Sequence, residues 1–153
     1  MRILVVEDED PKARHIRQFL FELVPEAQVE VARSVRAGLD ALSEALPDLL
    51  ILDMSLPTFD IGPTEAGGRP QGFGGLELIR NMELEGIECP TIVLTGYEAF
   101  AKSGGQVTLD GLSAELREEH PTIFRGIFHF NSAYGDWQAK LRSVFVSLGV
   151  LDS

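Results

Sequence analysis

Carboxylate side chains follow two short apolar runs of this 153-residue sequence. Glu7 and Asp8 come directly after residues 3–6 (ILVV), and Asp53 comes directly after residues 49–52 (LLIL). Carboxylate oxygens are ligands for hard divalent cations. If the two runs are neighbouring parallel strands, they lie about 4.8 Å apart. The three carboxylates would then crowd into one small pocket.

Such a pocket favours metal-assisted phosphate chemistry. Several like charges at close range raise one another's pKa values unless a cation intervenes. Mg²⁺ (or Mn²⁺) suits the site, since Mg²⁺ takes one or two carboxylates together with waters and phosphate oxygens. A carboxylate beside that ion can attack a phosphoryl group, because the ion neutralises the charge on the transferred oxygens.

Thr95 and Gly96 end a further apolar run and would add a hydroxyl donor and open backbone space to the same pocket. Each of these features has an ordinary explanation alone, because acidic residues after a strand are commonly solvated turn residues. Their joint placement at the ends of three different strands is what indicates a site.

Four mainly apolar runs, and one segment in which Val29 and Val31 alternate with polar neighbours, predict the strands that must position these residues. Each is short, rich in β-branched or aliphatic residues and bounded by charges, glycine or proline. The predicted strands are residues 3–6, 28–32, 49–52, 91–94 and 127–130.

Helical spacing of apolar residues predicts a helix after each strand. The first begins near Pro11 and is stopped by Pro25. The second is capped by Ser34 and carries Leu46 on its apolar face. The others are expected before Gly86, over residues 107–119, and after the last strand.

This alternation predicts an α/β fold with a doubly wound five-stranded parallel sheet and helices on both faces. The expected strand order is 2-1-3-4-5, as in flavodoxin-like folds. Ligands bind such sheets beyond the carboxyl ends of the strands, where the order reverses. That point lies between the first and third strands, where the acidic residues stand.

Three segments, LVVEDED, LILDMSLP and IVLTG, resemble the main motifs of the response regulator receiver family. The resemblance runs over nearly the whole chain. It implies that Asp53 is the phosphoacceptor and that Glu7 and Asp8 are the acidic pair that holds Mg²⁺, with Asp8 favoured as the direct ligand. It also implies that Ser55 offers its backbone carbonyl to the metal.

The same resemblance assigns three further positions. Pro57 matches the loop proline, and Thr95 matches the hydroxyl residue that moves to meet the aspartyl phosphate. Phe128 matches the aromatic residue whose rotamer reports the switch.

The sequence departs from the family at the end of the fifth strand. The family's lysine and the proline after it are replaced by Asn131 and Ser132. An asparagine donates a hydrogen bond but supplies no positive charge. We therefore expect Asp53 to be phosphorylated with weaker or altered output. A competing hypothesis is that Lys102 or another base reaches in from an inserted segment.

Two segments are longer than the family pattern, residues 58–74 and 97–124. The first contains GGRPQGFGG, which lacks the context of a nucleotide-binding loop. It is interpreted as a loop beside the active site, acting as a lid or a partner contact. The second is interpreted as a specialised interface or as a changed mode of dimerisation, so a homodimer is a possible assembly.

Composition excludes several function classes. The formal net charge is −11, from 24 acidic and 13 basic residues, which argues against nucleic-acid binding by this domain. No apolar run is long enough to cross a membrane, and the N-terminus does not read as a signal peptide. The lone Cys89 excludes an internal disulfide. A cytoplasmic protein is expected.

The prediction is a single receiver domain over residues 1–153 that is not an enzyme. It would accept a phosphoryl group on Asp53 from a histidine kinase or phosphotransfer protein and act by contact with a downstream protein. One alternative is a pseudo-receiver that is never phosphorylated. Another is a phosphatase with an aspartate nucleophile, although such enzymes place that residue after the first strand. A flavin-binding module is a remote third.

Overall fold

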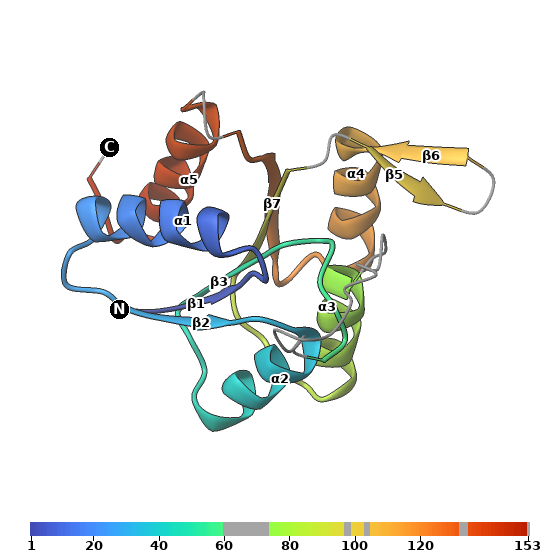
Figure 1. Cartoon of the computed structure of the whole chain (residues 1–153), viewed down its shortest axis with the longest axis horizontal. Helices are drawn as coiled ribbons and strands as arrows, with labels where there is room; N and C mark the ends of the chain where they lie inside the picture. Colours follow the sequence, from blue (N-terminus) through green and yellow to red (C-terminus); the bar gives the residue numbers. More distant parts are fainter. Residues whose placement is uncertain (60–73, 97–98, 103–104, 132–134, 153) are drawn as a thin grey trace.

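The computed structural model of the chain describes residues 1–59, 74–96, 99–102, 105–131 and 135–152, without the side chains of residues 99–107. A parallel sheet of five strands lies at its centre (Figure 1). The order is β2-β1-β3-β4-β7, which is the predicted order once the strands are counted within this sheet. The strands are β1 (Arg2–Val6), β2 (Gln28–Ala32), β3 (Leu49–Leu52), β4 (Thr91–Thr95) and β7 (Phe124–His129).

Helices cover both faces of the sheet, as predicted. In Figure 1, α1 and α5 lie together on one side, while α2, α3 and α4 lie on the other. The helices are α1 (Asp10–Leu23), α2 (Val35–Glu44), α3 (Gly74–Leu84), α4 (Leu109–Glu119) and α5 (Asp136–Ser147).

Alternate residues of the central strands enter two different hydrophobic cores. In β1, Ile3 and Val5 pack with Ile16 of α1 in one core, while Leu4 and Val6 belong to the other. All four are at most 3% exposed. The strands therefore read as continuous apolar runs, because both of their faces are buried.

Local signals place most helix ends where the sequence predicts them. The Ser34 hydroxyl accepts a hydrogen bond from the Ala37 backbone N–H and caps α2. Gly86 follows α3 with a φ of +71°, a conformation that glycine adopts without strain. The prediction for Leu46 is wrong. α2 already ends at Glu44, so Leu46 lies beyond the helix and is 56% exposed.

The segment over residues 97–124 contains the predicted helix, α4, and a hairpin that the sequence did not predict. β5 (Ala99–Lys102) and β6 (Gly105–Thr108) pair antiparallel, and Figure 1 places them beside α4, away from the central sheet. The last strand also starts three residues earlier than predicted, because Phe124 already pairs with Thr91 of β4. The interpretation of residues 58–74 falls largely on residues outside the described part.

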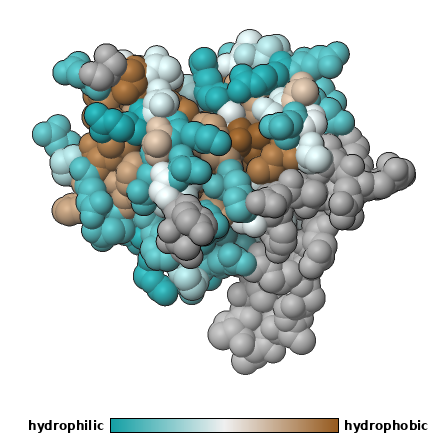
Figure 2. Space-filling model, turned by 90° about the horizontal axis from the view of Figure 1, so that it is seen from above, coloured by the Kyte–Doolittle hydropathy of each residue, from teal (hydrophilic) through white to brown (hydrophobic). Residues whose placement is uncertain are grey.

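The surface combines hydrophilic residues with scattered apolar ones. Figure 2 shows brown patches among teal side chains on one face of the molecule. Among the residues that the structure describes, the exposed large hydrophobic side chains are far apart in the sequence: Phe21, Leu46, Phe59, Leu84 and Val150.

Candidate functional site

The strand register brings the acidic residues to one level at the carboxyl end of the sheet. Val6 pairs with Leu52, so the next residues, Glu7 and Asp53, come level on adjacent strands. The Asp53 backbone N–H donates to the Val6 carbonyl at 3.0 Å, which continues the pairing one step past β3. This is the place where the strand order reverses, as expected for a ligand site in such a sheet.

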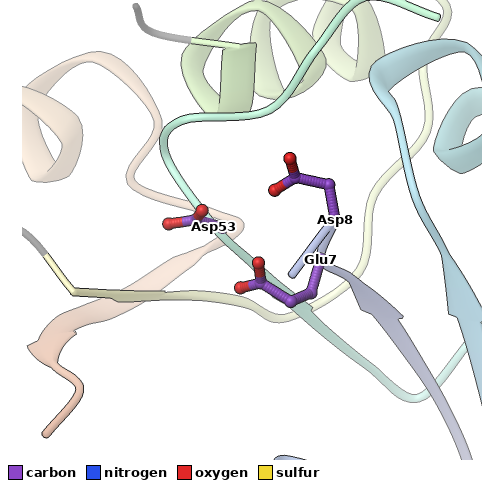
Figure 3. Close-up of side chains that lie close together, drawn as sticks. All are labelled: Glu7, Asp8 and Asp53. Carbon is purple, nitrogen blue, oxygen red and sulfur yellow. The ribbon is translucent and has the colours of Figure 1, made fainter. Parts of the chain in front are cut away.

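Three carboxylates meet there. One oxygen each from Glu7, Asp8 and Asp53 can be chosen so that all lie within 4.8 Å of one another. Figure 3 shows the three side chains around one small region, two from the end of β1 and one from the end of β3. Glu7 and Asp53 are 1% and 4% exposed, and Asp8 is half-buried. This oxygen donor set suits a hard divalent cation.

A lysine lies inside the same cluster. Lys12, in the first turn of α1, is 5% exposed, and its Nζ lies 2.6 Å from Glu7 Oε1 and 3.2 Å from Asp53 Oδ1. It also donates to the Leu94 carbonyl at 2.6 Å. The ammonium therefore touches the ends of three neighbouring strands, β1, β3 and β4.

Burial changes the acidity of Glu7. Removal from water raises the pKa of its carboxyl group from 4.5 to about 7. Lys12 opposes that rise, and the negative charge of Asp53 adds to it. Glu7 Oε2 also accepts a hydrogen bond from the Glu9 backbone N–H. The pocket thus holds more negative charge than one lysine stabilises.

The backbone after β3 is held closely around Asp53. Asp53 Oδ1 accepts a hydrogen bond from the Met54 backbone N–H at 2.8 Å. The start of α3 packs against the same segment, since the Gly75 N–H donates to the Met54 carbonyl. A Cβ at Gly75 would lie 2.4 Å from the Asp53 carbonyl oxygen. Only glycine allows this close approach.

The loop that follows Asp53 is buried and anchored to the next helix. Ser55 and Pro57 are both buried, and the Pro57 carbonyl accepts a hydrogen bond from the Val35 N–H at the start of α2. The loop therefore stays at the site edge, where Ser55 was predicted to contribute its carbonyl. That role stays a prediction.

The other predicted residues lie at the same edge. Thr95 is the last residue of β4 and is fully buried, and its carbonyl accepts from the Phe130 N–H. Phe128 pairs with Leu94 and is half-buried, and Asn131 follows β7 in a half-buried position. The structure thus brings these positions to one end of the sheet, and their individual roles stay predictions.

Lys12 is the site residue that sequence reasoning missed. Its signal was helical spacing, because Lys12, Ile16 and Leu20 are four residues apart and all three are buried in α1. A lysine on the buried apolar face of a helix needs a negatively charged or hydrogen-bonding partner that is buried with it. Lys102, proposed as the replacement base, lies in β5, and its side chain is outside the described part.

Comparison with known families agrees with this geometry. The response regulator receiver domain family matches residues 3–111, which include all three strand-end motifs. The chain belongs to the response regulator receiver family. This result confirms the family resemblance and the place of the chain in two-component signalling.

Relatives of similar length support the assignment. The chain is 28% identical over 151 residues to an uncharacterized protein, y4jR, of Sinorhizobium fredii, covering 97% of this chain and 99% of that one. It is 27% identical over 143 residues to the Detocs response regulatory protein DtcB of Enterobacter cloacae, covering 92% and 95%. The Vibrio alginolyticus protein of that name is 30% identical over 141 residues, covering 90% and 95%.

Solved structures agree on the fold. The signal receiver domain of a DNA binding response regulator from Colwellia psychrerythraea superposes with a TM-score of 0.64 at 20% identity, covering 99% of both chains. At that identity the likeness concerns the fold alone. Among the described residues, no helix has the length and apolar character needed to span a membrane.

Proposed function

We propose that residues 1–153 form a single receiver domain that accepts a phosphoryl group on Asp53, with Mg²⁺ or Mn²⁺ bound beside it. The observation that carries the proposal is the cluster of Glu7, Asp8 and Asp53 at the reversal of the strand order. The donor is a histidine kinase or a phosphotransfer protein. The output is contact with a downstream protein.

The charges of the pocket support a bound divalent ion. Three carboxylates and the Lys12 ammonium carry a formal charge of −2 when all are ionised. Asp8 and Asp53, with the Ser55 carbonyl, would bind the ion directly, and Glu7 would complete the acidic pair beside it. The bound ion supplies neutralisation of the charge on the transferred phosphoryl oxygens.

The residues of the chain itself prepare the transfer. Met54 and Lys12 hold the Asp53 carboxylate in one orientation. One Asp53 oxygen attacks the phosphorus of a phosphohistidine, so an O–P bond forms while the P–N bond breaks and the imidazole nitrogen keeps the electron pair. Thr95 stands at the neighbouring strand end to donate its hydroxyl to the phosphoryl group.

Asn131 favours the alternative of a pseudo-receiver, because the charged residue of the family pattern is missing there, and the two longer segments, residues 58–74 and 97–124, favour it as well. The pocket opposes it, because the buried side chains of Glu7 and Lys12 around Asp53, which is itself buried, are energetically costly to keep without a function. An aspartate-nucleophile phosphatase has weaker support, since Asp53 follows β3, the third strand along the chain.

The comparisons support a regulatory role and a domain of this size. The alignments cover 95% of both DtcB proteins, whose names describe response regulatory proteins of a Detocs system. A comparable regulatory role through protein contact is proposed for this chain. The formal net charge of −11 favours protein partners over nucleic acid.

Phosphodonor labelling tests the proposal. The purified protein is incubated with acetyl phosphate and Mg²⁺, and its intact mass is measured. We expect the mass of one phosphoryl group to be added to the wild type, and none after Asp53→Asn or chelation of the metal. Asp110→Asn, which removes an exposed acid of α4, is the matched control and should label normally.

An unlabelled wild type would contradict the proposal and favour the pseudo-receiver. Steady release of inorganic phosphate from a simple phosphomonoester would favour the phosphatase.

A further inference from the structure

Lys12 stands where a phosphoryl group on Asp53 would need a positive charge. We propose that Lys12, from the start of α1, binds that phosphoryl group and supplies the charge that Asn131 cannot. The inference rests on the proposed phosphorylation of Asp53. It gives the site an ammonium from the first helix in place of one from the last strand.

The contacts of the ammonium define its position. Lys12 donates a hydrogen bond to the Leu94 carbonyl at 2.6 Å, and its Nζ forms ion pairs with Glu7 Oε1 at 2.6 Å and Asp53 Oδ1 at 3.2 Å. A phosphoryl group on Asp53 is bonded directly to the carboxylate that Lys12 already touches. Its oxygens are therefore within reach of a small movement of the lysine side chain.

The position of Lys12 is unfavourable without a negative partner. It is 5% exposed, and a buried ammonium costs several kcal/mol unless it is paired. It also lies in the first turn of α1, where the helix dipole disfavours a cation. The carboxylates of Glu7 and Asp53 offset both costs. An apolar residue at position 12 would pack equally well beside Ile16 on the buried face of α1. Packing alone therefore does not explain why this position holds a lysine.

The ammonium also lies beside the strand that lacks the charge. Lys12 Nζ is 5.7 Å from the centre of the Phe130 ring, and Phe130 directly precedes Asn131. The ring contact places the cation next to the end of β7. A charge carried by α1 therefore reaches the edge at which the family pattern places its lysine.

This role separates Lys12 from the metal ligands. A cation beside a metal site repels the metal, so removal of Lys12 should tighten Mg²⁺ binding. Removal of a phosphoryl-binding cation should slow phosphorylation. A single substitution is thus expected to change the two quantities in opposite directions, which loss of the fold would not do.

The chain has three lysines, which makes a matched set of variants possible. We expect Lys12→Met to lower the rate of labelling by acetyl phosphate at saturating Mg²⁺ at least about tenfold, as for a lost charge-assisted hydrogen bond. Calorimetry should show Mg²⁺ bound at least as tightly as in the wild type. Lys140→Met, at an exposed site of α5, and Lys102→Met, in the hairpin, should label at the wild-type rate.

A charge returned from the other element provides the sharper test. Adding Asn131→Lys to Lys12→Met should restore most of the labelling rate, because the ammonium then comes from the end of β7. If Lys12 only stabilises the fold, the second substitution leaves the rate low and the inference is wrong. A normal rate for Lys12→Met alone also overturns it, and the proposed function stands. An unlabelled wild type overturns both.

A measurement on the wild type covers the case in which Lys12 variants do not fold. With ¹⁵N-labelled lysine, the protein has three side-chain ammonium groups to observe by NMR. Beryllofluoride with Mg²⁺ mimics the phosphoryl group. We expect the Lys12 signal to shift strongly on its addition while that of Lys140 stays in place. A Lys12 signal that does not respond, with beryllofluoride bound, would contradict the inference.

Discussion

Glu7 illustrates at the residue scale how the site uses burial. Its carboxyl group is 1% exposed, forms an ion pair with the Lys12 ammonium and accepts a hydrogen bond from the Glu9 backbone N–H. Lys12 offsets only part of the burial cost, so the pKa of Glu7 stays raised, at about 7. A buried group in this state makes the metal-free protein sensitive to pH.

We expect the metal-free protein to lose stability as the pH rises from about 4.5 to about 7. In that range the unfolded chain has released the Glu7 proton while the folded chain still holds it, so the free energy of unfolding falls as the pH rises. The loss should reach about 3 kcal/mol and be complete above pH 7. Urea unfolding in a chelator measures it. The control is Glu7→Gln, which lacks the titration. A wild-type-to-variant difference that is constant with pH would contradict the prediction.

Some residues of the site could be predicted from the sequence, and one could not. Glu7, Asp8 and Asp53 were predicted together because each directly follows a buried strand, where topology decides position. Lys12 was missed because a lysine in a helix is ordinarily solvated. Its partners Asp53 and Leu94 are 41 and 82 positions away, and only the folded sheet brings them together.

At the scale of elements, the start of α3 and the end of β3 fit together only through glycines. A Cβ at Gly74 would lie 2.1 Å from the Leu56 carbonyl oxygen, and one at Gly75 would lie 2.9 Å from Met54 Cα. These contacts are with backbone, which cannot rotate away. The packing of α3 therefore helps to hold the segment that carries Asp53.

Gly75→Ala should destabilise the protein by about 1–3 kcal/mol, because the new methyl group forces the backbone of α3 or of residues 53–54 to move. The comparison is Gly96→Ala, where an added Cβ meets nothing within 4 Å. Urea unfolding of both variants measures the difference. Equal stabilities would show that the α3 contact is not constrained as described.

The elements themselves were predicted to different degrees. Strands that are buried on both faces, such as β1 and β3, consist almost entirely of apolar residues and are easy to find in the sequence. Their parallel arrangement follows because a helix lies between each strand and the next. The hairpin of β5 and β6 was missed because each strand has four residues and pairs, in the described part, only with the other. Leu46 was misplaced because apolar spacing alone does not mark where α2 ends.

At the scale of the whole molecule, stability and chemistry occupy different regions. Two hydrophobic cores on opposite faces of the sheet stabilise the fold, and the charged site lies at one end of the sheet between them. The candidate site residues follow β1 and β3, end β4 or lie at the start of α1, and the strand order β2-β1-β3-β4-β7 brings these strand ends together at the carboxyl edge. The topology alone accounts for the meeting of residues so distant along the chain.

A crystal structure of the wild type grown with Mg²⁺ and beryllofluoride would show directly whether the acidic cluster binds a metal ion and Asp53 accepts a phosphoryl group. We expect an ion bound by Asp8, Asp53 and the Ser55 carbonyl, beryllofluoride on an Asp53 oxygen, and Lys12 Nζ within hydrogen-bond distance of a fluorine. A crystal grown with both reagents in which the acidic cluster holds no ion and Asp53 carries no beryllofluoride would contradict it.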